Sequence, residues 1–401
     1  QQGTRRTVSG NQRTRSVLVV AEVALALLLL VGSGLLLRSL QRLFSIDAGF
    51  NTSHLLTVQV QTSNQRYSAS GAAYQFFTEA LEAARRVPGV TAAALTSQLP
   101  LSGDSEMYGV HFEPSLALDP GEIRGTFRYA VSPGYLETMG IPLRRGRLLN
   151  ELDHADAPRV ALVSQSLARR RLPGLDPIGQ RLRVGSGPLY TVVGVVGDVK
   201  QMSLTLNETE AVYVTPAQWR FADNVMSLIV RTRGSAVALT DAIRQAIWSV
   251  DKDQPIVRVA TMDELVAATA AERRFALILF QAFALAALML AAAGIYGLLA
   301  GSVAERTREM GVRAALGASR TRILALVLGQ GMTLTGLGML AGVAGALPLS
   351  RVLETMLFDV SPLDSITYIS GIALLAAVAL LACAVPAWRA ARVDPARTLA
   401  A

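Results

Sequence analysis

The sequence is poor in cysteine, lysine and histidine, and in charged residues generally. Its 401 residues include one cysteine (Cys383), two lysines and three histidines. A single cysteine excludes a disulfide-stabilised scaffold, and 33 Gly with 16 Pro exclude a collagen-like or Pro/Gly-rich disordered chain. Charged residues make up 17%, hydrophobic residues 51%, and the mean hydropathy is +0.37. This composition is typical of a membrane protein, because soluble domains hold about 25% charged residues.

Motifs for chemistry are also lacking. No G-x-x-x-x-G-K-[ST] occurs, which excludes ATP binding by a P-loop within these residues. His54, His111 and His154 are far apart and belong to no H-E-x-x-H, so we expect exposed loop residues and no metal site. Gly194 to Asp198 resembles a phosphate loop only superficially, and a turn at a strand end is the favoured interpretation. We therefore predict no catalytic, cofactor or metal site and no enzyme activity in this chain.

Four apolar stretches are long enough to cross a bilayer, which needs about 20 helical residues. They comprise residues 17–37, 275–304, 323–350 and 366–388. A signal peptide is the competing interpretation of the first stretch, since Arg13 and Arg15 precede a Leu-rich run. The run is long for a signal peptide, however, and no A-x-A-like site follows it. We predict four transmembrane helices in contact with a lipid bilayer.

The arginines predict how these helices are oriented. Segments 1–16, 305–322 and 389–401 hold 12 arginines and a net charge of +9, whereas the short segment 351–365 has a net charge of −2. The positive-inside rule then places both termini and 305–322 in the cytoplasm, and 351–365 with a large domain at 38–274 outside it. Residues 55–260 hold 21 basic and 19 acidic residues. The net charge of +8 and the pI of about 10 thus reflect membrane topology, and we expect no nucleic-acid partner.

The domain at 38–274 alternates short strands with helices, which predicts an α+β fold. Thr261 and Glu264 fit a capping box that opens a helix toward the membrane. The stretches 102–105 and 113–121 are expected loops. Predicted strands are 56–61, 90–95, 159–163, 180–184, 189–196, 211–214 and 226–231, with a hairpin turn at 185–187; predicted helices are 71–87, 133–139, 164–171 and 237–250.

Two features of the membrane segments have alternative interpretations. Glu22 is a carboxylate in a predicted span, which is often functional, but it lies close to the cytoplasmic end. Contact with lipid headgroups, or pairing with a neighbouring arginine, is the favoured interpretation. Gly338, Gly342 and Gly345 form a small-residue face that permits close helix contact and is a weak indication of dimerisation.

The segment 304–318 is short and dense in charge of both signs, and it lies between two apolar helices. Glu309 and Arg313 are spaced i, i+4, and Glu305 and Arg308 are spaced i, i+3. A stiff amphipathic element here could dock into a groove of a soluble partner. A solvated loop that obeys the positive-inside rule is equally compatible with these residues.

The same segment carries a family resemblance. ERTREMGVRAALGA (305–318) and PAWRAARVDPARTL (386–399) resemble the FtsX-type permease domain of MacB-like ABC transporters. GYLETMGIPLRRGR (134–147), LARRRLPGLDPIGQRLRV (167–184), YTVVGVVGDVK (190–200) and TMDELV (261–266) resemble the MacB-like periplasmic core domain. The resemblance covers nearly the whole chain and is closest to the second half of acidobacterial-type duplicated permeases. We therefore expect a piece of a longer product.

The resemblance implies a fold of four transmembrane helices with porter-like and Sabre-like subdomains inserted between helices 1 and 2. It also implies a bacterial inner-membrane permease that a separate cytoplasmic ABC ATPase, holding ATP and Mg, drives by mechanotransmission. A second permease half or subunit and a periplasmic adaptor are further implied partners. Met310 and Val312 stand where the motif usually has Ile. The implied ATPase-coupling residues are Glu305, Arg306, Arg308, Glu309, Gly311, Arg313, Leu316 and Gly317.

Two functions remain open at this point. A permease subunit for efflux or export of a small molecule, peptide or lipid-linked cargo is favoured. The alternative is a membrane interaction protein that regulates an envelope hydrolase or sensor kinase and moves no cargo. No motif in 38–274 indicates a substrate.

Overall fold

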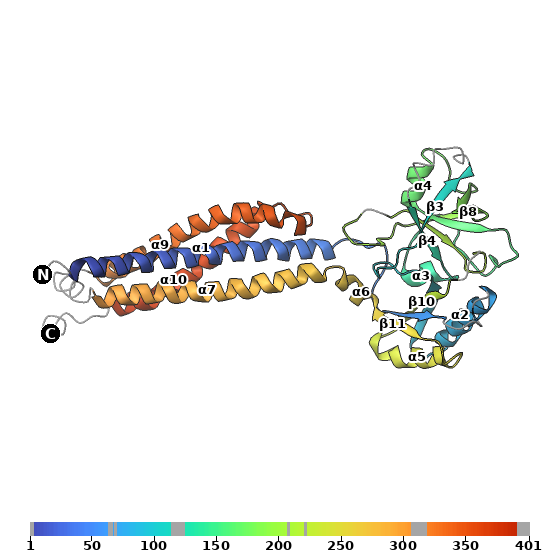
Figure 1. The fold of residues 1–401 in the computed structure, drawn as a ribbon, viewed down its shortest axis with the longest axis horizontal. Helices are drawn as coiled ribbons and strands as arrows, with labels where there is room; N and C mark the ends of the chain where they lie inside the picture. Colours follow the sequence, from blue (N-terminus) through green and yellow to red (C-terminus); the bar gives the residue numbers. More distant parts are fainter. Residues whose placement is uncertain are drawn as a thin grey trace. The chain divides into compact units, whose positions relative to one another are not determined.

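The computed structural model describes residues 4–62, 67, 70–113, 125–206, 209–219, 223–305 and 319–390. The chain divides into two compact units (Figure 1). A helical unit combines Gln1–Ser45 with Ala271–Ala401, and a mixed α/β unit comprises Ile46–Ala270. The predicted fold class is confirmed: four long apolar helices accompany a large α+β domain that is inserted between the first and the second of them.

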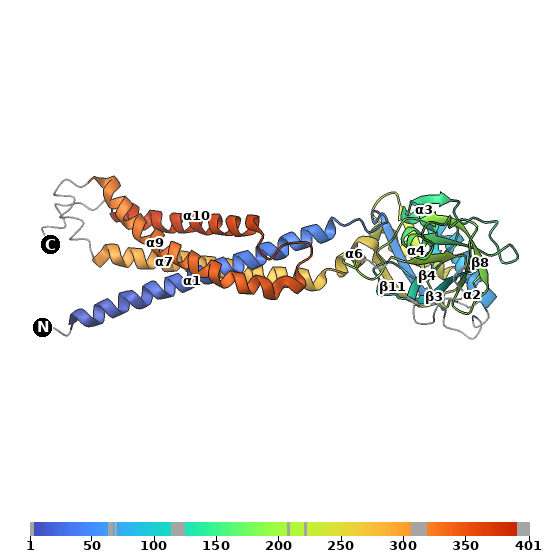
Figure 2. The same cartoon turned by 90° about the horizontal axis from the view of Figure 1, so that it is seen from above.

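The helical unit contains α1 (Thr4–Phe44), α7 (Ala271–Glu305), α9 (Arg320–Val352) and α10 (Ser365–Ala390), with a short 3₁₀ turn η5 (Leu353–Met356) after α9. All four helices are long and apolar enough to cross a membrane. Both views show them as one bundle (Figures 1 and 2). Each helix continues past the apolar stretch predicted from the sequence, since the arginines, glutamines and alanines that flank these stretches are good helix formers. Large side chains such as Leu340, Ile369 and Leu381 are exposed on the bundle surface, as lipid-facing residues are.

Helix α1 lies at the centre of this bundle. It contacts α7, α9 and α10, whereas α7 and α9 have little contact with each other. Val19, Val23, Leu27, Val31 and Leu35 recur every four residues along α1 and are all buried in the bundle core. This spacing places one apolar face of α1 against its neighbours.

The glycine face of α9 packs against α1 of the same chain. A Cβ added to Gly338 would lie 2.6 Å from the Val23 Cβ, and one added to Gly342 would lie 2.9 Å from the Ala24 carbonyl oxygen. Gly345 faces Leu28 in the same way. The small-residue face therefore brings the two backbones together within one chain, and its contacts in the structure are intramolecular.

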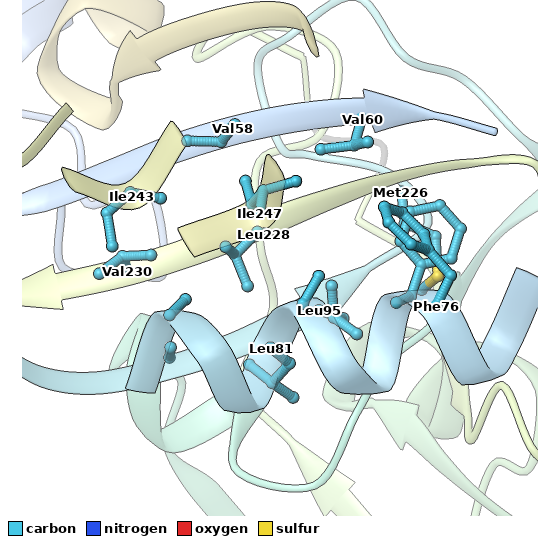
Figure 3. Packing of buried hydrophobic residues seen from close by; sticks show 14 of the residues in the cluster. Val58, Val60, Phe76, Leu81, Leu95, Met226, Leu228, Val230, Ile243 and Ile247 are labelled. Atoms are coloured by element: carbon cyan, nitrogen blue, oxygen red, sulfur yellow. The ribbon is translucent and has the colours of Figure 1, made fainter. Parts of the chain in front are cut away.

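The mixed unit has two lobes, the first built on a four-stranded antiparallel sheet. Its strand order is β11-β1-β10-β2, formed by β11 (Ile256–Thr261), β1 (Leu55–Gln61), β10 (Val225–Thr232) and β2 (Val90–Thr96). Helices α2 (Ser70–Arg85) and α5 (Thr240–Trp248) pack on the sheet; the 3₁₀ turn η4 (Val237–Leu239) precedes α5. Figure 3 shows the core between them: Val58 and Val60 of β1, Leu228 and Val230 of β10, Leu81 of α2 and Ile243 and Ile247 of α5 are among its buried members.

The second lobe is a seven-stranded mixed sheet in the order β5-β8-β6-β9-β4-β3-β7. Because β7 pairs with β8 as well as with β3, six of these strands close into a ring. Helix α4 (Gln165–Arg171) contacts β6 and β8 of this sheet, whereas α3 (Tyr135–Met139) contacts β2 and β10 of the first sheet. The strands are β3 (Met107–Phe112), β4 (Gly125–Ala130), β5 (Leu143–Gly146), β6 (Val160–Ser164), β7 (Arg181–Val184), β8 (Leu189–Val196) and β9 (Ala211–Val214).

Backbone and side-chain hydrogen bonds join the two lobes. Ser97, directly after β2, donates its N–H to the Ala130 carbonyl at 2.9 Å, and its Oγ accepts from the Ala130 N–H at 3.0 Å. Thr96 also bridges Val131 in an antiparallel pairing. The Arg231 guanidinium of β10 donates to the Thr138 carbonyl at the end of α3. The seam therefore fixes the end of the first sheet against β4 and α3.

The predicted strands, helices and β7–β8 hairpin of this unit are confirmed, apart from their ends. Strands β3, β4, β5 and β11 were not predicted. The predicted helix 237–250 is the turn η4 followed by α5, and 113–121 lies outside the described residues beyond Glu113. The Thr261–Glu264 capping box is present, but it opens α6 (Met262–Ala268), which ends before α7 begins at Ala271.

Replacing Gly342 by Leu should destabilise the helical unit by about 2 kcal/mol, because a side chain there overlaps the backbone of α1. Gly336 on the same helix has no atom within 4 Å of the corresponding Cβ position. We expect Gly336→Leu to leave stability unchanged. Unfolding of the detergent-solubilised chain with increasing sodium dodecyl sulfate measures the difference, and equal midpoints for the two variants would contradict the α1–α9 contact.

Candidate functional site

The structure describes one of the eight predicted coupling residues. Glu305 is the last residue of α7 and is exposed. Arg306, Arg308, Glu309, Gly311, Arg313, Leu316 and Gly317 lie outside the described residues. On the far side of this segment, Ser319 precedes the first residue of α9 with an extended backbone, and its Oγ lies 3.0 Å from the Thr321 hydroxyl. The segment thus joins the ends of two long helices, α7 and α9.

At the other end of α7 the chain leads into the mixed unit. Strand β11 is followed by α6 and, after two residues, by α7. Helix α1 leads into the same unit through β1, and β1 and β11 are adjacent antiparallel strands, with Leu56 opposite Thr261 and Val58 opposite Val259. The two helices that connect the units therefore continue into neighbouring strands of one sheet.

The connection between α9 and α10 is bound to α1 and α7 by a set of contacts that we name the clasp. It consists of Arg38 and Ser39 of α1 and Arg273 of α7, together with Met356, Phe358 and Asp364 of the connection. Arg38 forms an ion pair with Asp364. The Ser39 Oγ accepts from the Phe358 N–H at 2.8 Å, and the Arg273 Nε donates to the Met356 carbonyl at 3.2 Å. Ser39 is completely buried.

Asp364 also caps α10. Its Oδ2 accepts from the Thr367 N–H at 2.9 Å and from the Thr367 hydroxyl at 2.6 Å, as an N-cap carboxylate does. Burial raises the pKa of the Asp364 carboxyl, but the hydrogen bonds from Thr367 and the ion pair with Arg38 outweigh it, so the pKa lies below its ordinary value. The carboxylate is therefore ionised at neutral pH and bridges α1 and α10.

Glu22 lies against α7 within the bundle. Its Oε2 is buried where a Cβ on Gly294 would be placed. Among the side chains that the structure describes, no arginine pairs with it and no hydrogen-bond donor reaches Oε2. Pairing with a neighbouring arginine is thus not seen within that part of the chain, and headgroup contact stays a prediction.

The mixed unit buries one arginine completely. Arg128 of β4 donates two parallel hydrogen bonds to Asp223, at 2.8 and 2.9 Å, and also pairs with Glu106. Its guanidinium lies 4.5 Å from the ring centre of Trp219 and 5.6 Å from that of Tyr108. A planar cation between an aromatic face and a bidentate carboxylate is strongly fixed in orientation.

The charges of this cluster compensate one another. Burial alone would lower the pKa of Arg128, but Asp223 and Glu106 hold it above its usual value. Burial, together with the neighbouring carboxylates of Asp223 and Asp104, raises the pKa of Glu106 despite the lowering effect of Arg128. Because Arg128 is held by side chains of the same unit, we interpret the cluster as a structural anchor of the second lobe.

Other candidate residues are used in local structure. The His54 Nδ1 lies 2.9 Å from the Gly234 carbonyl oxygen, and the described residues contain no group of three His, Cys, Asp or Glu side chains placed to hold a metal ion. Gly194 belongs to β8, and Asp198 beyond its end accepts from the Ser166 N–H at 2.7 Å. The strand end is confirmed, since β8 ends at Val196, but residues 197–200 continue as irregular backbone and not as the expected turn. A pocket of about 440 Å³ beside Asp198 is lined by charged residues of both signs that include Arg169 and Arg170, which pair with Asp198 and Glu210.

Two family models match the chain in succession. Residues 16–247, more than half of the chain, match the MacB-like periplasmic core domain, and residues 282–395 match the FtsX-like permease C-terminal region. The chain belongs to the MacB/FtsX-type ABC transporter permease family. The FtsX-like match contains most of α7, the segment 306–318, α9 and α10, which is the part of the chain where the sequence predicted coupling.

Named relatives of this MacB-like chain are consistent with the assignment. It is 28% identical over 280 residues to the pyoverdine export ATP-binding/permease protein PvdT of Pseudomonas putida, covering 66% of this chain and 41% of that protein. It is 29% identical over 288 residues to the macrolide export ATP-binding/permease protein MacB of Azoarcus sp.. This match covers 68% of this chain and 42% of that protein. The chain thus spans about two fifths of the length of these relatives.

Solved structures were also compared with the MacB-like chain. The periplasmic region of MacB from Actinobacillus actinomycetemcomitans covers 57% of this chain and 97% of its own at 13% identity, with a TM-score of 0.37. The extracellular domain of YknZ from Gram-positive bacteria matches 49% of this chain and 94% of its own length at 12% identity, with a TM-score of 0.34. Both scores are below 0.5, so the family assignment rests on the sequence matches.

Sequence reasoning missed the clasp and the buried arginine. Arg38 and Asp364 are 326 positions apart, and no local pattern links them. Two signals were available: an Asp placed directly before the apolar run of α10, as N-cap residues are, and an Arg at the end of an apolar helix. The acidic residues of 351–365 were interpreted as a topology signal alone.

Replacing Arg128 by Met should lower the free energy of unfolding of the second lobe by about 3 kcal/mol, because it leaves the largely buried Asp223 carboxylate without its counter-charge. Arg145→Met is the matched control, since Arg145 and its partner Asp176 are more than half exposed. Urea unfolding followed by Trp219 fluorescence, with Trp248 and Trp388 replaced by Phe, measures both. Equal midpoints would contradict the structural role of the cluster.

Proposed function

We propose that this chain is a permease subunit of an ABC transporter in the bacterial cytoplasmic membrane. A separate cytoplasmic ATPase binds the segment 305–318, and ATP hydrolysis there moves the mixed unit on the opposite side of the membrane. The movement serves efflux or export. ATP and Mg belong to the ATPase subunit, and a second permease half or subunit completes the membrane part.

The observation that carries this proposal is the continuity of α7. It runs without interruption from Ala271, two residues after α6, to Glu305, the first of the predicted coupling residues. At 1.5 Å per residue its length is roughly 50 Å. A rigid helix of this length transmits a displacement at one end to the other end. The connection to β11 then delivers the displacement to the sheet of the first lobe.

The composition of 305–318 supports an interaction with a soluble protein. Glu305, Arg308, Glu309 and Arg313 are charged, while Leu316 is apolar. Helical spacing would place the charges in i, i+3 and i, i+4 pairs, and such an element fits a groove on a partner surface. The relatives PvdT and MacB are named ATP-binding/permease proteins, whereas the 401 residues here hold no P-loop motif. The ATPase that this segment would contact therefore lies outside these 401 residues.

The orientation follows from charge. The three Arg-rich segments 1–16, 305–322 and 389–401 lie in the cytoplasm, and the mixed unit lies in the periplasm. The export assignment is supported by the export function in the names of the two relatives, and the cargo class is left open.

Labelling of single cysteines tests the orientation. In a Cys383→Ala background, Leu152→Cys places a thiol at a side chain that is 77% exposed in the mixed unit. We expect a membrane-impermeant maleimide to label it in intact cells with a permeabilised outer membrane. Arg13→Cys, exposed on α1, should be labelled only after the inner membrane is opened. The reverse pattern would place the mixed unit in the cytoplasm and remove the basis of the proposal.

Charge reversal tests the coupling segment. The double variant Glu309→Arg with Arg313→Glu should abolish the stimulation of the cognate ATPase by the reconstituted permease, because it inverts the charge pattern on the docking element. Membrane insertion should be unchanged. ATPase rates in proteoliposomes, with and without the permease, measure the effect.

Arg322→Glu is the matched control for this experiment. Arg322 is exposed near the start of α9 on the same side of the membrane and lies outside the predicted coupling residues. We expect it to retain full stimulation. Undiminished stimulation in the double variant would mean that the ATPase binds elsewhere.

A further inference from the structure

The clasp binds α1 to α7 and to the α9–α10 connection. The predicted coupling segment, residues 305–318, is not continuous with α1 along the chain. That segment links α7 and α9 directly, whereas α1 is separated from it by the whole mixed unit. Yet α1, like α7, leads into the mixed unit. At the level of the bundle, a displacement that begins at 305–318 reaches α1 through contacts between the helices and not along the chain.

Among the described residues, two sets of these contacts differ in kind. Along its middle, α1 touches the glycine face of α9 and the apolar side chains of the core. Such surfaces resist separation but present no directional bond against sliding along the helix axis. At its outer end, Arg38 and Ser39 are bound to Asp364 and to the Phe358 N–H by directional hydrogen bonds. A slip of one residue, about 1.5 Å, would break both.

The clasp differs from ordinary surface pairing. Ser39 is fully buried, and the Arg38 and Asp364 side chains are 29% and 16% exposed. The next ion pair along α1, Arg42 with Asp359, is 44% and 75% exposed and has a 3.0 Å contact. Exposed pairs of this kind contribute little, while a partly buried, hydrogen-bonded pair defines register.

Asp364 does not need Arg38 in order to cap α10. Thr367 already supplies the N–H and hydroxyl that a cap carboxylate accepts. Removing Arg38 therefore leaves the start of α10 intact and removes only the link to α1.

We propose that the clasp is the positioning element that makes α1 move together with α7 and α9, so that both helices leading to the mixed unit are displaced as one body. This inference rests on the proposed coupling function. Arg38 and Asp364 fix the register of α1, Ser39 binds the turn of the connection, and Arg273 holds the same turn to α7.

The distance between the outer ends of α1 and α7 tests the proposal. Phe44→Cys on α1 and Phe275→Cys on α7 replace exposed side chains, and Cys383→Ala removes the native thiol. The distance between spin labels at these two positions is measured by double electron–electron resonance. The full chain is reconstituted in lipid nanodiscs without nucleotide. With the clasp intact we expect one narrow distance distribution.

Adding Arg38→Gln should widen that distribution at least twofold, whereas the control Arg42→Gln should leave it unchanged. Equal widths for the two variants would overturn the inference. A thermal unfolding transition of Arg38→Gln within a few degrees of the parent shows that the variant is folded. If Arg38→Gln is not folded, Ser39→Ala replaces it with the same expected widening, since it removes the bond from the Phe358 N–H and the longer one to the Met356 carbonyl.

A second measurement separates this inference from the proposed function. Arg38→Gln should retain stimulation of the ATPase, since segment 305–318 is untouched. In the parent, nucleotide should leave the α1–α7 distance unchanged because both helices move as one body, whereas in Arg38→Gln nucleotide should change that distance. If the parent does not stimulate the ATPase, the proposed function is refuted. The distances measured without nucleotide still test the clasp in that case. If nucleotide leaves the α1–α7 distance of Arg38→Gln unaltered while ATPase stimulation is complete, the proposed role of the clasp is refuted and the proposed function stands.

Discussion

The close packing of α1 against its neighbours is the contact on which the helical unit depends. In a bilayer, apolar side chains gain nothing by leaving lipid for protein, so helices associate through tight van der Waals contact and polar bonds. The glycines of α9 allow its backbone to approach α1, and α7 and α10 contact other parts of the α1 surface. Because α7 and α9 barely touch, α1 and α10 are what hold the two ends of the coupling segment in one bundle.

Charge has two roles at the ends of this bundle. The arginine-rich segments and the acidic connection 351–365 satisfy the rule that orients membrane helices. At the outer end, however, two of the acidic residues meet arginines of α1, Arg38 with Asp364 and Arg42 with Asp359. The positive charges at this end of α1 are thus neutralised by acidic residues of the connection. One set of side chains thereby serves both topology and bundle register.

Much of the fold could be predicted from the sequence because its signals are local. Long apolar runs define the four helices, a Gly-Ser-Gly turn defines the β7–β8 hairpin, and Thr261 with Glu264 defines a cap. Strand β5 could not be predicted, since its Leu-Arg-Arg-Gly residues are all exposed and show no alternation. The clasp and the Arg128 cluster join residues remote in sequence, and partner choice between remote charges depends on the tertiary fold. The coupling role of all eight residues, Glu305 included, remains a prediction.

A displacement delivered to β11 is useful only if the mixed unit does not absorb it internally. Strand β1 pairs with β11 along its length apart from one register shift after Gln59, and β10 pairs with both β1 and β2. From the end of β2, Ser97 and Thr96 bond to Ala130 and Val131 at the end of β4, the strand on which Arg128 is buried. Arg128 in turn fixes Glu106 before β3 and Asp223 before β10.

An arginine is well suited to this position, because bidentate and stacked contacts restrict rotation more than an apolar side chain of the same volume would. The buried charge is therefore best understood as a stiffening element that connects the two lobes along the path from α7 and α1.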